Sequence, residues 1–335
     1  MNILAVITYF TIITITSYVL IKIYIRFCID KKILNIPLNI SKNINKKIIP
    51  TSAGLVIFLF FIFLILILYL FNKEYFISIP RPEILIGSII LLGAISFSDD
   101  LKSINPIYRF IFQTIIVFLS LTTIESHIIK SMPFKLSLIL IIYFWIYHIN
   151  IINFIDGIDG FAISHVIFAC LAIIISCQIS NYDVIEKYIS LILLSISIGF
   201  LMLNKPPAKV FMGDSGSIVF GYLIGWLAIR LLQHDLWFVS LIIIMYPVLD
   251  VTLTIIIKIS KGKKPWDRLF DYFFLQGVKN KKISHLKTIM LFNLHNVISL
   301  ILVVLSFKIN PIYTVGLAFI SSTILIMKYN QYKIK

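Results

Sequence analysis

Long apolar runs separated by short polar segments dominate this chain. A helix that crosses a membrane takes about 20 mostly apolar residues, and eleven stretches come close to or exceed that length. They cover residues 3–25, 52–71, 83–98, 107–124, 135–152, 161–179, 187–203, 216–232, 236–257, 288–307 and 311–327. The pattern predicts an all-α, polytopic integral membrane protein in which residues 1–335 form a single transmembrane domain.

The composition agrees with a bilayer as the surrounding solvent. Hydrophobic residues make up 59% of the 335 residues and charged residues only 13%, whereas an average soluble domain is about 45–50% apolar and about 25% charged. A soluble core cannot bury so much apolar surface. The composition therefore excludes a disordered chain, a secreted disulfide scaffold and a cytosolic enzyme.

The distribution of positive charge indicates the orientation of the chain. The formal net charge is +15, from 30 Lys and Arg against 15 Asp and Glu. With the N-terminus outside, 22 of the 30 basic residues fall in the inner segments and seven in the outer ones, as the positive-inside rule requires. We therefore expect an outside N-terminus and a cytoplasmic C-terminus. We expect no nucleic-acid partner, because no basic run has the pattern of a nucleic-acid-binding face.

The longest polar segment, residues 258–287, mixes lysines with aromatic residues, namely Trp266, Phe270, Tyr272, Phe273 and Phe274. This mixture is typical of a segment that lies at a membrane interface. We therefore expect a cytoplasmic or interfacial loop here. Its single histidine, His285, is a candidate for catalysis because it lies on the same side as the acidic segments described next.

Aspartates are concentrated in three inner segments, each directly beside an apolar run. They are Asp99 with Asp100, Asp156 with Asp159, and Asp214. Carboxylates at the edge of a membrane are costly and are usually functional. Adjacent carboxylates such as Asp99 and Asp100 repel each other unless a cation is present, so the pair indicates a metal or a proton-transfer role, or else the first turn of a helix.

The second and third segments point to a phosphate ligand. Asp156 and Asp159 are spaced to share one helix face, Asn150 and Asn153 repeat the spacing one turn earlier, and oxygen-only ligands suit Mg²⁺ or Mn²⁺ rather than Zn²⁺. A simple turn between two helices is the alternative. The Gly- and Ser-rich start of the next helix can bind an anion through its amides, with Lys209 adding charge and Asp214 completing a metal site. The alternative there is an ordinary capped helix start.

Asp250 lies within the ninth apolar run, about two turns before Lys258. An intramembrane acid is a candidate for function by default. A buried, hydrogen-bonded carboxylate with a structural role is the alternative.

Three segments carry a resemblance to a known family: residues 98–102 (SDDLK), 150–162 (NIINFIDGIDGFA) and 204–217 (NKPPAKVFMGDSGS). The chain resembles the polyprenyl-phosphate N-acetylhexosamine-1-phosphate transferases, glycosyltransferase family 4. That family includes the enzymes that start O-antigen, enterobacterial common antigen and teichoic acid synthesis, and the peptidoglycan enzyme MraY. The residues of the third segment and the Ser284-His285 pair resemble the O-antigen-initiating branch more than MraY.

The resemblance implies a reaction and a setting. The phosphate of undecaprenyl phosphate attacks the β-phosphorus of a UDP-N-acetylhexosamine, UMP leaves, and a lipid-linked diphosphate sugar that starts a surface polysaccharide remains. The cofactor implied is Mg²⁺, with Mn²⁺ as an alternative. The implied location is the bilayer of the bacterial cytoplasmic (inner) membrane with the active face cytoplasmic, and the family also allows a homodimer.

The resemblance also assigns residue roles by position. Asp99 and Asp100 match the acidic pair tied to lipid-phosphate activation or metal binding, and Asp214 matches the aspartate tied most directly to Mg²⁺. The implied catalytic set is Asp99, Asp100, Asp156, Asp159 and His285. The implied substrate-binding set is Asn153, Lys102, Asn204, Lys209 and Lys282.

One departure and several alternatives remain. Family members usually carry two or more histidines in the last inner loop, whereas this chain has only His285 there, with Lys282 three positions earlier. A catalytically degenerate member is therefore one alternative. A CDP-alcohol phosphatidyltransferase also uses a DxxDG sequence, but its later acidic pattern is absent here, and an aromatic prenyltransferase would space its aspartates by four. A cation-coupled transporter would place its acids near the midplane rather than at one face.

Overall fold

The computed structural model describes residues 3–31, 49–124, 132–182, 184–264 and 272–332, and within these ranges it contains helices and no strands. In chain order the α-helices are α1 (Ile3–Asp30), α2 (Gly54–Phe71), α3 (Pro82–Leu101), α4 (Pro106–Ser120), α5 (Phe134–Ile155), α6 (Phe161–Ile179), α7 (Ile185–Asn204), α8 (Asp214–Gln233), α9 (Trp237–Ser260), α10 (Phe273–Lys279), α11 (His285–Leu305) and α12 (Pro311–Asn330). Two short 3₁₀ helices, η2 (Lys73–Phe76) and η3 (Leu121–Thr123), follow α2 and α4.

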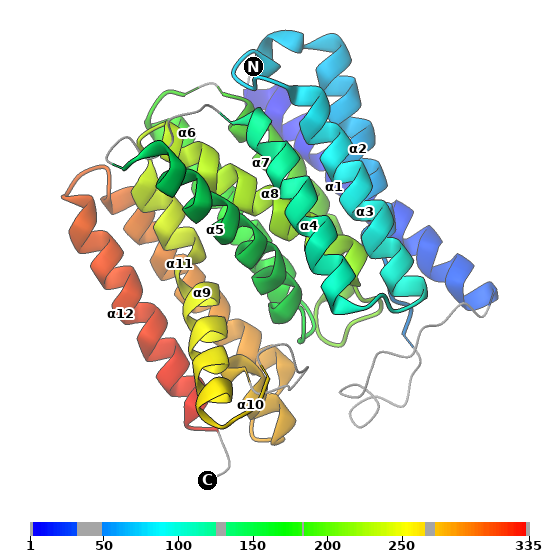
Figure 1. Cartoon of the computed structure of the whole chain (residues 1–335). Coiled ribbons are helices and arrows are strands. Elements are labelled where there is room, and N and C mark those ends of the chain that lie inside the picture. Colours follow the sequence, from blue (N-terminus) through cyan, green and yellow to red (C-terminus); the bar gives the residue numbers. More distant parts are fainter. Residues whose placement is uncertain (1–2, 32–48, 125–131, 183, 265–271, 333–335) are drawn as a thin grey trace.

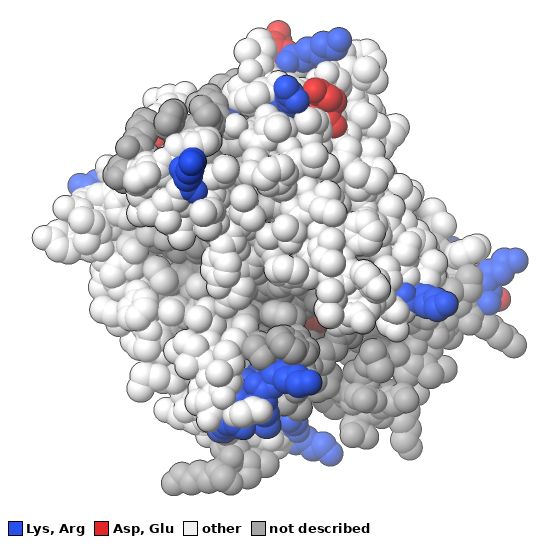
Figure 2. Space-filling model, in the orientation of Figure 1, with Lys and Arg blue, Asp and Glu red and all other residues white. Residues whose placement is uncertain are grey.

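Eleven of the helices in the described part of the chain are long and apolar enough to cross a membrane. They coincide with the eleven apolar runs of the sequence, so the predicted all-α fold with eleven candidate spans is confirmed. The helices lie roughly side by side, and the N- and C-terminal ends of the chain lie at opposite ends of the bundle (Figure 1). On the face shown in Figure 2, the charged side chains of the described residues gather near the two ends, and the band between them is almost free of charge.

Helix α8 forms the centre of the bundle. It packs against α2, α3, α5 and α9 and is buried along nearly its whole length. Glycines allow its closest approaches: a Cβ on Gly54 of α2 would lie 2.0 Å from the backbone nitrogen of Gly216. Only glycine lets two backbones come this close, so the first turn of α8 is held tightly against the start of α2.

Polar contacts between α5 and α8 fix their relative position. Trp145 Nε1 donates a 2.9 Å hydrogen bond to the carbonyl oxygen of Tyr222, and His148 Nδ1 lies 2.9 Å from the carbonyl oxygen of Gly221. At the far end of α8, the buried Arg230 pairs with the buried Glu186 of α7. Buried polar groups of this kind are stable only when paired, so they specify one register of the central helices.

Two helices begin with the same local signal. Asn105 Oδ1 accepts a 3.0 Å hydrogen bond from the Ile107 amide before α4, and Asn310 Oδ1 accepts one of the same length from the Ile312 amide before α12. Each asparagine is followed by a proline at the first helical position. Asparagine caps and N1 prolines are favoured helix starts.

Part of the segment at 258–287 is a buried helix. It contains the seven-residue helix α10, and Phe273, Phe274 and Leu275 of this helix are buried inside the protein. Tyr272 is also buried, whereas Trp266 and Phe270 lie outside the described residues. The aromatic and aliphatic side chains of residues 272–275 therefore pack inside the protein, and the expected cytoplasmic or interfacial position of the segment stays a prediction.

Candidate functional site

The three acidic segments meet at one end of the helix bundle. Asp99 and Asp100 lie in the last turn of α3, Asp156 follows the last residue of α5, and Asp214 is the first residue of α8. The directions of these helices place all of these positions at the end of the bundle where the C-terminal helix α12 also finishes. The sequence prediction that the segments share one face is therefore consistent with the fold.

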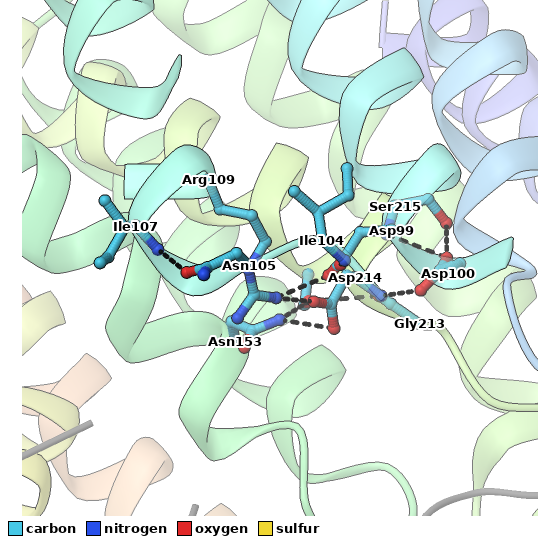
Figure 3. Close-up of polar contacts among 11 residues, drawn as sticks. Asp99, Asp100, Ile104, Asn105, Ile107, Arg109, Asn153, Gly213, Asp214 and Ser215 are labelled. Carbon is cyan, nitrogen blue, oxygen red and sulfur yellow. Dashed lines mark hydrogen bonds and ion pairs between the residues drawn. The ribbon is translucent and has the colours of Figure 1, made fainter. Parts of the chain in front are cut away.

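Arg109 lies at the centre of the acidic cluster. Its Nη1 atom is 2.6 Å from Asp99 Oδ2 and 2.7 Å from Asp214 Oδ2, so one guanidinium nitrogen bridges carboxylates from α3 and α8 (Figure 3). The three side chains are only 6–22% exposed. In this partly buried setting a charge-assisted hydrogen bond is stronger than on the open surface, so Arg109 fixes the separation of the two carboxylates.

Asp100 holds the first turn of α8. Its Oδ1 accepts a 2.8 Å hydrogen bond from the Asp214 amide, and its Oδ2 accepts from the amide and the hydroxyl of Ser215 at 3.2 and 2.7 Å. A carboxylate at a helix N-terminus is favourable because it satisfies free amides and the helix dipole. The amides that the sequence suggested for a phosphate are thus partly engaged by the protein's own carboxylate.

Gly213 is required for this arrangement. Its φ of +77° is a conformation that residues with side chains rarely adopt. A Cβ atom at this position would also lie 2.7 Å from Asp100 Oδ2. The glycine before Asp214 therefore lets the α3 carboxylate reach the amides of α8.

Asn153 orients Asp214 from α5. Its side-chain Nδ2 donates to Asp214 Oδ1 at 3.0 Å and to Ser217 Oγ at 2.9 Å, and it lies beside Arg109 in Figure 3. Asn150, one turn earlier, instead donates to Gln113 Oε1 of α4 at 2.8 Å. The two asparagines therefore serve different contacts, and only Asn153 joins the acidic cluster. The proposed contact of Asn153 with substrate stays a prediction.

Asp156 and Asp159 do not share a helix face. Helix α5 ends at Ile155, and residues 156–160 form turns before α6 begins. Asp156 leaves the helical conformation with a ψ of 44°, so the spacing rule for helices does not apply to the pair. The sequence prediction of a shared helix face is wrong, although both residues remain at the end of the bundle that carries the site.

Asp156 interacts electrostatically with the other carboxylates. Burial, together with the negative charges of Asp214, Asp100 and Asp159, raises the pKa of Asp156 well above its ordinary value. Each of these carboxylates disfavours the ionised form of its neighbour. A bound cation would offset this repulsion.

Asp159 and His285 meet on the other side of the same turn. His285 is the first residue of α11, and its Nδ1 lies 3.4 Å from Asp159 Oδ1. Neither ring nitrogen of His285 forms a hydrogen bond to a described residue. Asp159 Oδ2 accepts a 3.0 Å hydrogen bond from the Ala208 amide, which ties the second acidic segment to the third. Both nitrogens are buried, and the contact of His285 with a substrate stays a prediction.

Asn204 has a structural place that the sequence did not indicate. Its Oδ1 accepts from the Gly160 amide at 2.9 Å, and its Nδ2 donates to the Val210 carbonyl oxygen at 2.9 Å. The side chain is buried, with 2% exposure. Asn204 therefore joins the 156–160 turn to the 205–213 segment, and the geometry favours this role over the substrate contact that we expected.

The three predicted substrate-binding lysines, Lys102, Lys209 and Lys282, are all exposed. Lys102 follows α3, Lys209 lies in the segment before α8, and Lys282 lies between α10 and α11. Each of these lysines lies in a segment next to a site helix in the sequence, and none of them is part of the acidic cluster. Their exposure suits contact with a phosphorylated ligand, and that contact stays a prediction.

The carboxylate oxygens of the acidic cluster are suitable ligands for a magnesium ion. Asp99 and Asp214 already converge on one positively charged atom, Arg109 Nη1. Among the described residues, no three Asp, Glu, His or Cys side chains form a complete metal site. Mg²⁺ in proteins is typically held by one or two carboxylates, with waters and substrate phosphates completing the shell. Asp99, Asp100 and Asp214 could hold it in this way, and the oxygens of all three carboxylates already accept contacts from described residues.

Sequence reasoning missed two parts of the site. Arg109 was counted only as an inner positive charge; it lies in the first turn of α4, beyond the short connection that follows the acidic pair. Residues 50–54 were not identified either. Their backbone runs beside the third segment, with hydrogen bonds from Phe211 N to Pro50 O, Ala53 N to Phe211 O and Gly54 N to Met212 O at 2.8–3.1 Å.

Comparison with known proteins identifies the family. The profile of glycosyl transferase family 4 matches residues 83–232. A phospho-N-acetylmuramoyl-pentapeptide-transferase of Buchnera aphidicola is 32% identical over 264 residues, which cover 68% of this chain and 74% of that protein. The chain belongs to glycosyl transferase family 4. The family resemblance that the three sequence segments indicated is confirmed.

Two further relatives carry different names within the family. A probable undecaprenyl-phosphate N-acetylglucosaminyl 1-phosphate transferase of Bacillus subtilis is 28% identical over 237 residues, covering 67% of this chain and 64% of that protein. A phospho-N-acetylmuramoyl-pentapeptide-transferase of Helicobacter acinonychis is 29% identical over 264 residues, covering 68% of this chain and 71% of that protein. Family membership is thus shared with transferases of more than one substrate.

The family match contains most of the acidic cluster. Asp99, Arg109, Asp156 and Asp214 all fall within residues 83–232, whereas His285 and Lys282 lie beyond it. The shared core of glycosyl transferase family 4 therefore covers the carboxylates and their bridging arginine. The 258–287 segment, with its single histidine, lies outside the matched residues.

Proposed function

We propose that this protein transfers N-acetylhexosamine 1-phosphate from a UDP-sugar to undecaprenyl phosphate and releases UMP. The observation that carries this proposal is the convergence of Asp99 and Asp214 on Arg109, from three helices at one end of a membrane-type bundle. Acidic groups near a diphosphate require a cation between them, and the membrane-type helices suit a lipid acceptor. Family membership and the names of the relatives support the same reaction.

The reaction needs no covalent intermediate on the protein. The phosphate oxygen of the lipid attacks the β-phosphorus of the UDP-sugar, the bond from this phosphorus to the bridging oxygen breaks, and UMP leaves with the electron pair. The second pKa of a phosphate ester is about 6, so the lipid phosphate is largely dianionic at neutral pH. A side chain that removes a proton is therefore not required, and the protein mainly positions the reactants.

Mg²⁺ is part of the proposal. When bound, the ion offsets negative charge on the phosphate oxygens during transfer. Asp214 and Asp99 would hold it, while Asn153 and Arg109 keep these carboxylates in place. Lys102, Lys209 and Lys282 would add positive charge for the diphosphate, and His285 would contact the sugar nucleotide from α11.

We also propose the orientation of the molecule. Successive spans place the acidic cluster and most of the lysines and arginines on the same side of the membrane. By the positive-inside rule this side is the cytoplasm, so the active end faces the cytoplasm and the N-terminus lies outside. UDP-sugars are cytoplasmic metabolites, so this orientation gives the donor access. The setting is then the bacterial cytoplasmic membrane, and the product would start a surface polysaccharide such as O-antigen.

The test is UMP release by the purified protein in detergent. Undecaprenyl phosphate, Mg²⁺ and each of several UDP-N-acetylhexosamines are supplied, with and without the lipid. We expect lipid-dependent UMP from one donor, which also names the sugar. UMP that forms without lipid would indicate hydrolysis, and no UMP from any donor with folded protein would favour a catalytically degenerate member.

A further inference from the structure

Asp250 is a carboxylate in the interior of α9, and the proposed reaction gives it no task. Its side chain is fully buried, at 0% exposure, three residues after Pro247 within the same helix. A carboxylate at such a position in a membrane-type helix is costly and is retained for a purpose. Its contacts show what that purpose is.

Asp250 caps the short helix α10 from the side. Its Oδ1 accepts from the Phe273 amide at 3.1 Å, and its Oδ2 accepts from the Phe274 amide at 3.3 Å and from the Tyr246 hydroxyl at 2.7 Å. The residue before α10, Tyr272, gives no side-chain cap of its own. The first amides of a helix need acceptors, and Asp250 supplies them from a different helix.

Helix α10 in turn rests on the second acidic segment. A Cβ on Gly157 would lie 3.2 Å from the Leu275 side chain, so α10 covers the residue directly after Asp156. The Phe274 ring stacks on Phe161 with 4.5 Å between ring centroids. Phe161 directly follows the 156–160 turn and stacks on Phe292 of α11 at 4.1 Å.

The same helix also sets the start of α11. The amides of Lys282 and Ile283 donate to the Gly277 carbonyl oxygen at 2.9 and 3.3 Å. Ser284 then caps α11 by accepting from the Lys287 amide. This turn brings His285 to its place beside Asp159.

We propose that Asp250 is a positioning residue for the transfer reaction. It docks α10, and α10 fixes both the turn that carries Asp156 and Asp159 and the start of α11 that carries His285. The inference rests on the proposed function, because it assigns Asp250 a task in that same site. Asp250 itself does not touch the reactants.

The first test measures docking without activity. Hydrogen exchange is followed in detergent for peptides that cover residues 273–279 and 156–161. In Asp250→Ala we expect faster exchange in both peptides, with α8 unchanged. Tyr246→Phe is the matched control, because it removes one donor to Asp250 and leaves the α10 amides capped. Unchanged exchange in both peptides of Asp250→Ala would overturn the proposal.

The second test measures coupling to the site. We expect the kcat for UMP release to fall about tenfold or more in folded Asp250→Ala, since small displacements of reacting groups are costly. In a His285→Ala background the Asp250→Ala substitution should lower kcat much less, because Asp250 acts in part by placing His285, which is already absent. Fully additive effects, or a wild-type kcat in the folded fraction, would contradict the positioning role.

Two controls keep the outcomes separable. If Asp250→Ala does not fold, Asp250→Asn carries the same comparison, because its amide oxygen retains one of the two acceptor positions. A wild-type protein that releases no UMP would count against the proposed function itself. The exchange measurement would still decide whether Asp250 docks α10 over the 156–160 turn.

Discussion

Arg109 Nη1 and Asp214 Oδ2 lie 2.7 Å apart, although 105 positions separate the two residues in the chain. The same nitrogen contacts Asp99 on α3. Arg109 thereby couples the starts of α4 and α8 to the end of α3. The relationship gives the acidic cluster a built-in cation and explains how its carboxylates can lie close together in a partly buried place.

Replacement of Arg109 by glutamine should lower the rate of UMP release about a hundredfold or more, the usual range when a preorganised charge is lost. The two carboxylates would repel each other and separate. Steady-state kinetics of purified Arg109→Gln checks this. Arg81→Gln, at the opposite end of the bundle before α3, is the matched control and should be unaffected. A wild-type rate for Arg109→Gln would mean that the bridge has no part in catalysis.

Replacement of Asp100 by alanine should lower both thermal stability and activity. The amides of Asp214 and Ser215 would lose their acceptor, and loss of a helix cap costs about 0.5–2 kcal/mol. Asp100→Asn, which keeps one acceptor oxygen, should lie between wild type and Asp100→Ala in a thermal unfolding assay. Equal stability of all three proteins would show that the Asp100 contacts do not hold the start of α8.

Asp214→Asn should abolish turnover at every Mg²⁺ concentration, because the amide retains the shape of the side chain but not its charge. The measurement is an Mg²⁺ titration of UMP release. Asp235→Asn, just after the other end of α8, makes the same chemical change away from the site and should behave as wild type. Recovery of the Asp214→Asn rate at high Mg²⁺ would argue for weakened rather than lost metal binding.

His285→Ala should weaken turnover at least tenfold, the lower range for the loss of one polar group that contacts a substrate. It removes the only histidine of the 258–287 segment and the contact to Asp159. Kinetics with the UDP-sugar varied would place the effect on binding or on turnover. An unchanged rate would assign the sugar-nucleotide contact to Lys282 or Lys287 instead.

The eleven long helices could be predicted because membrane-type hydropathy is a local property of each segment. The three acidic segments could also be found, since carboxylates beside apolar runs stand out against a chain with few charges. The two carboxylate partners of Arg109 could not be predicted. Its two carboxylates come from segments on either side of it, and only the packing of α3, α4 and α8 brings them together.

Two further misses have local causes. The spacing of Asp156 and Asp159 suggested a helix face, but the helix stops at Ile155 and the following residues form turns. The aromatic residues of the 258–287 segment did not reveal that α10 packs inside the protein, since exposure to lipid and burial in protein favour the same side chains. The first two amides of α10 also donate hydrogen bonds to Asp250, which lies on another helix.

The fate of the donor's β-phosphate tests the central claim most directly. Purified protein receives undecaprenyl phosphate, Mg²⁺ and the active UDP-N-acetylhexosamine labelled with ³²P at the β-phosphorus, and the products are separated into lipid and aqueous fractions. Transfer of a sugar 1-phosphate predicts that the label moves into the lipid fraction while unlabelled UMP is released. Label that stays in the aqueous fraction as UDP, with the sugar alone on the lipid, would contradict the account.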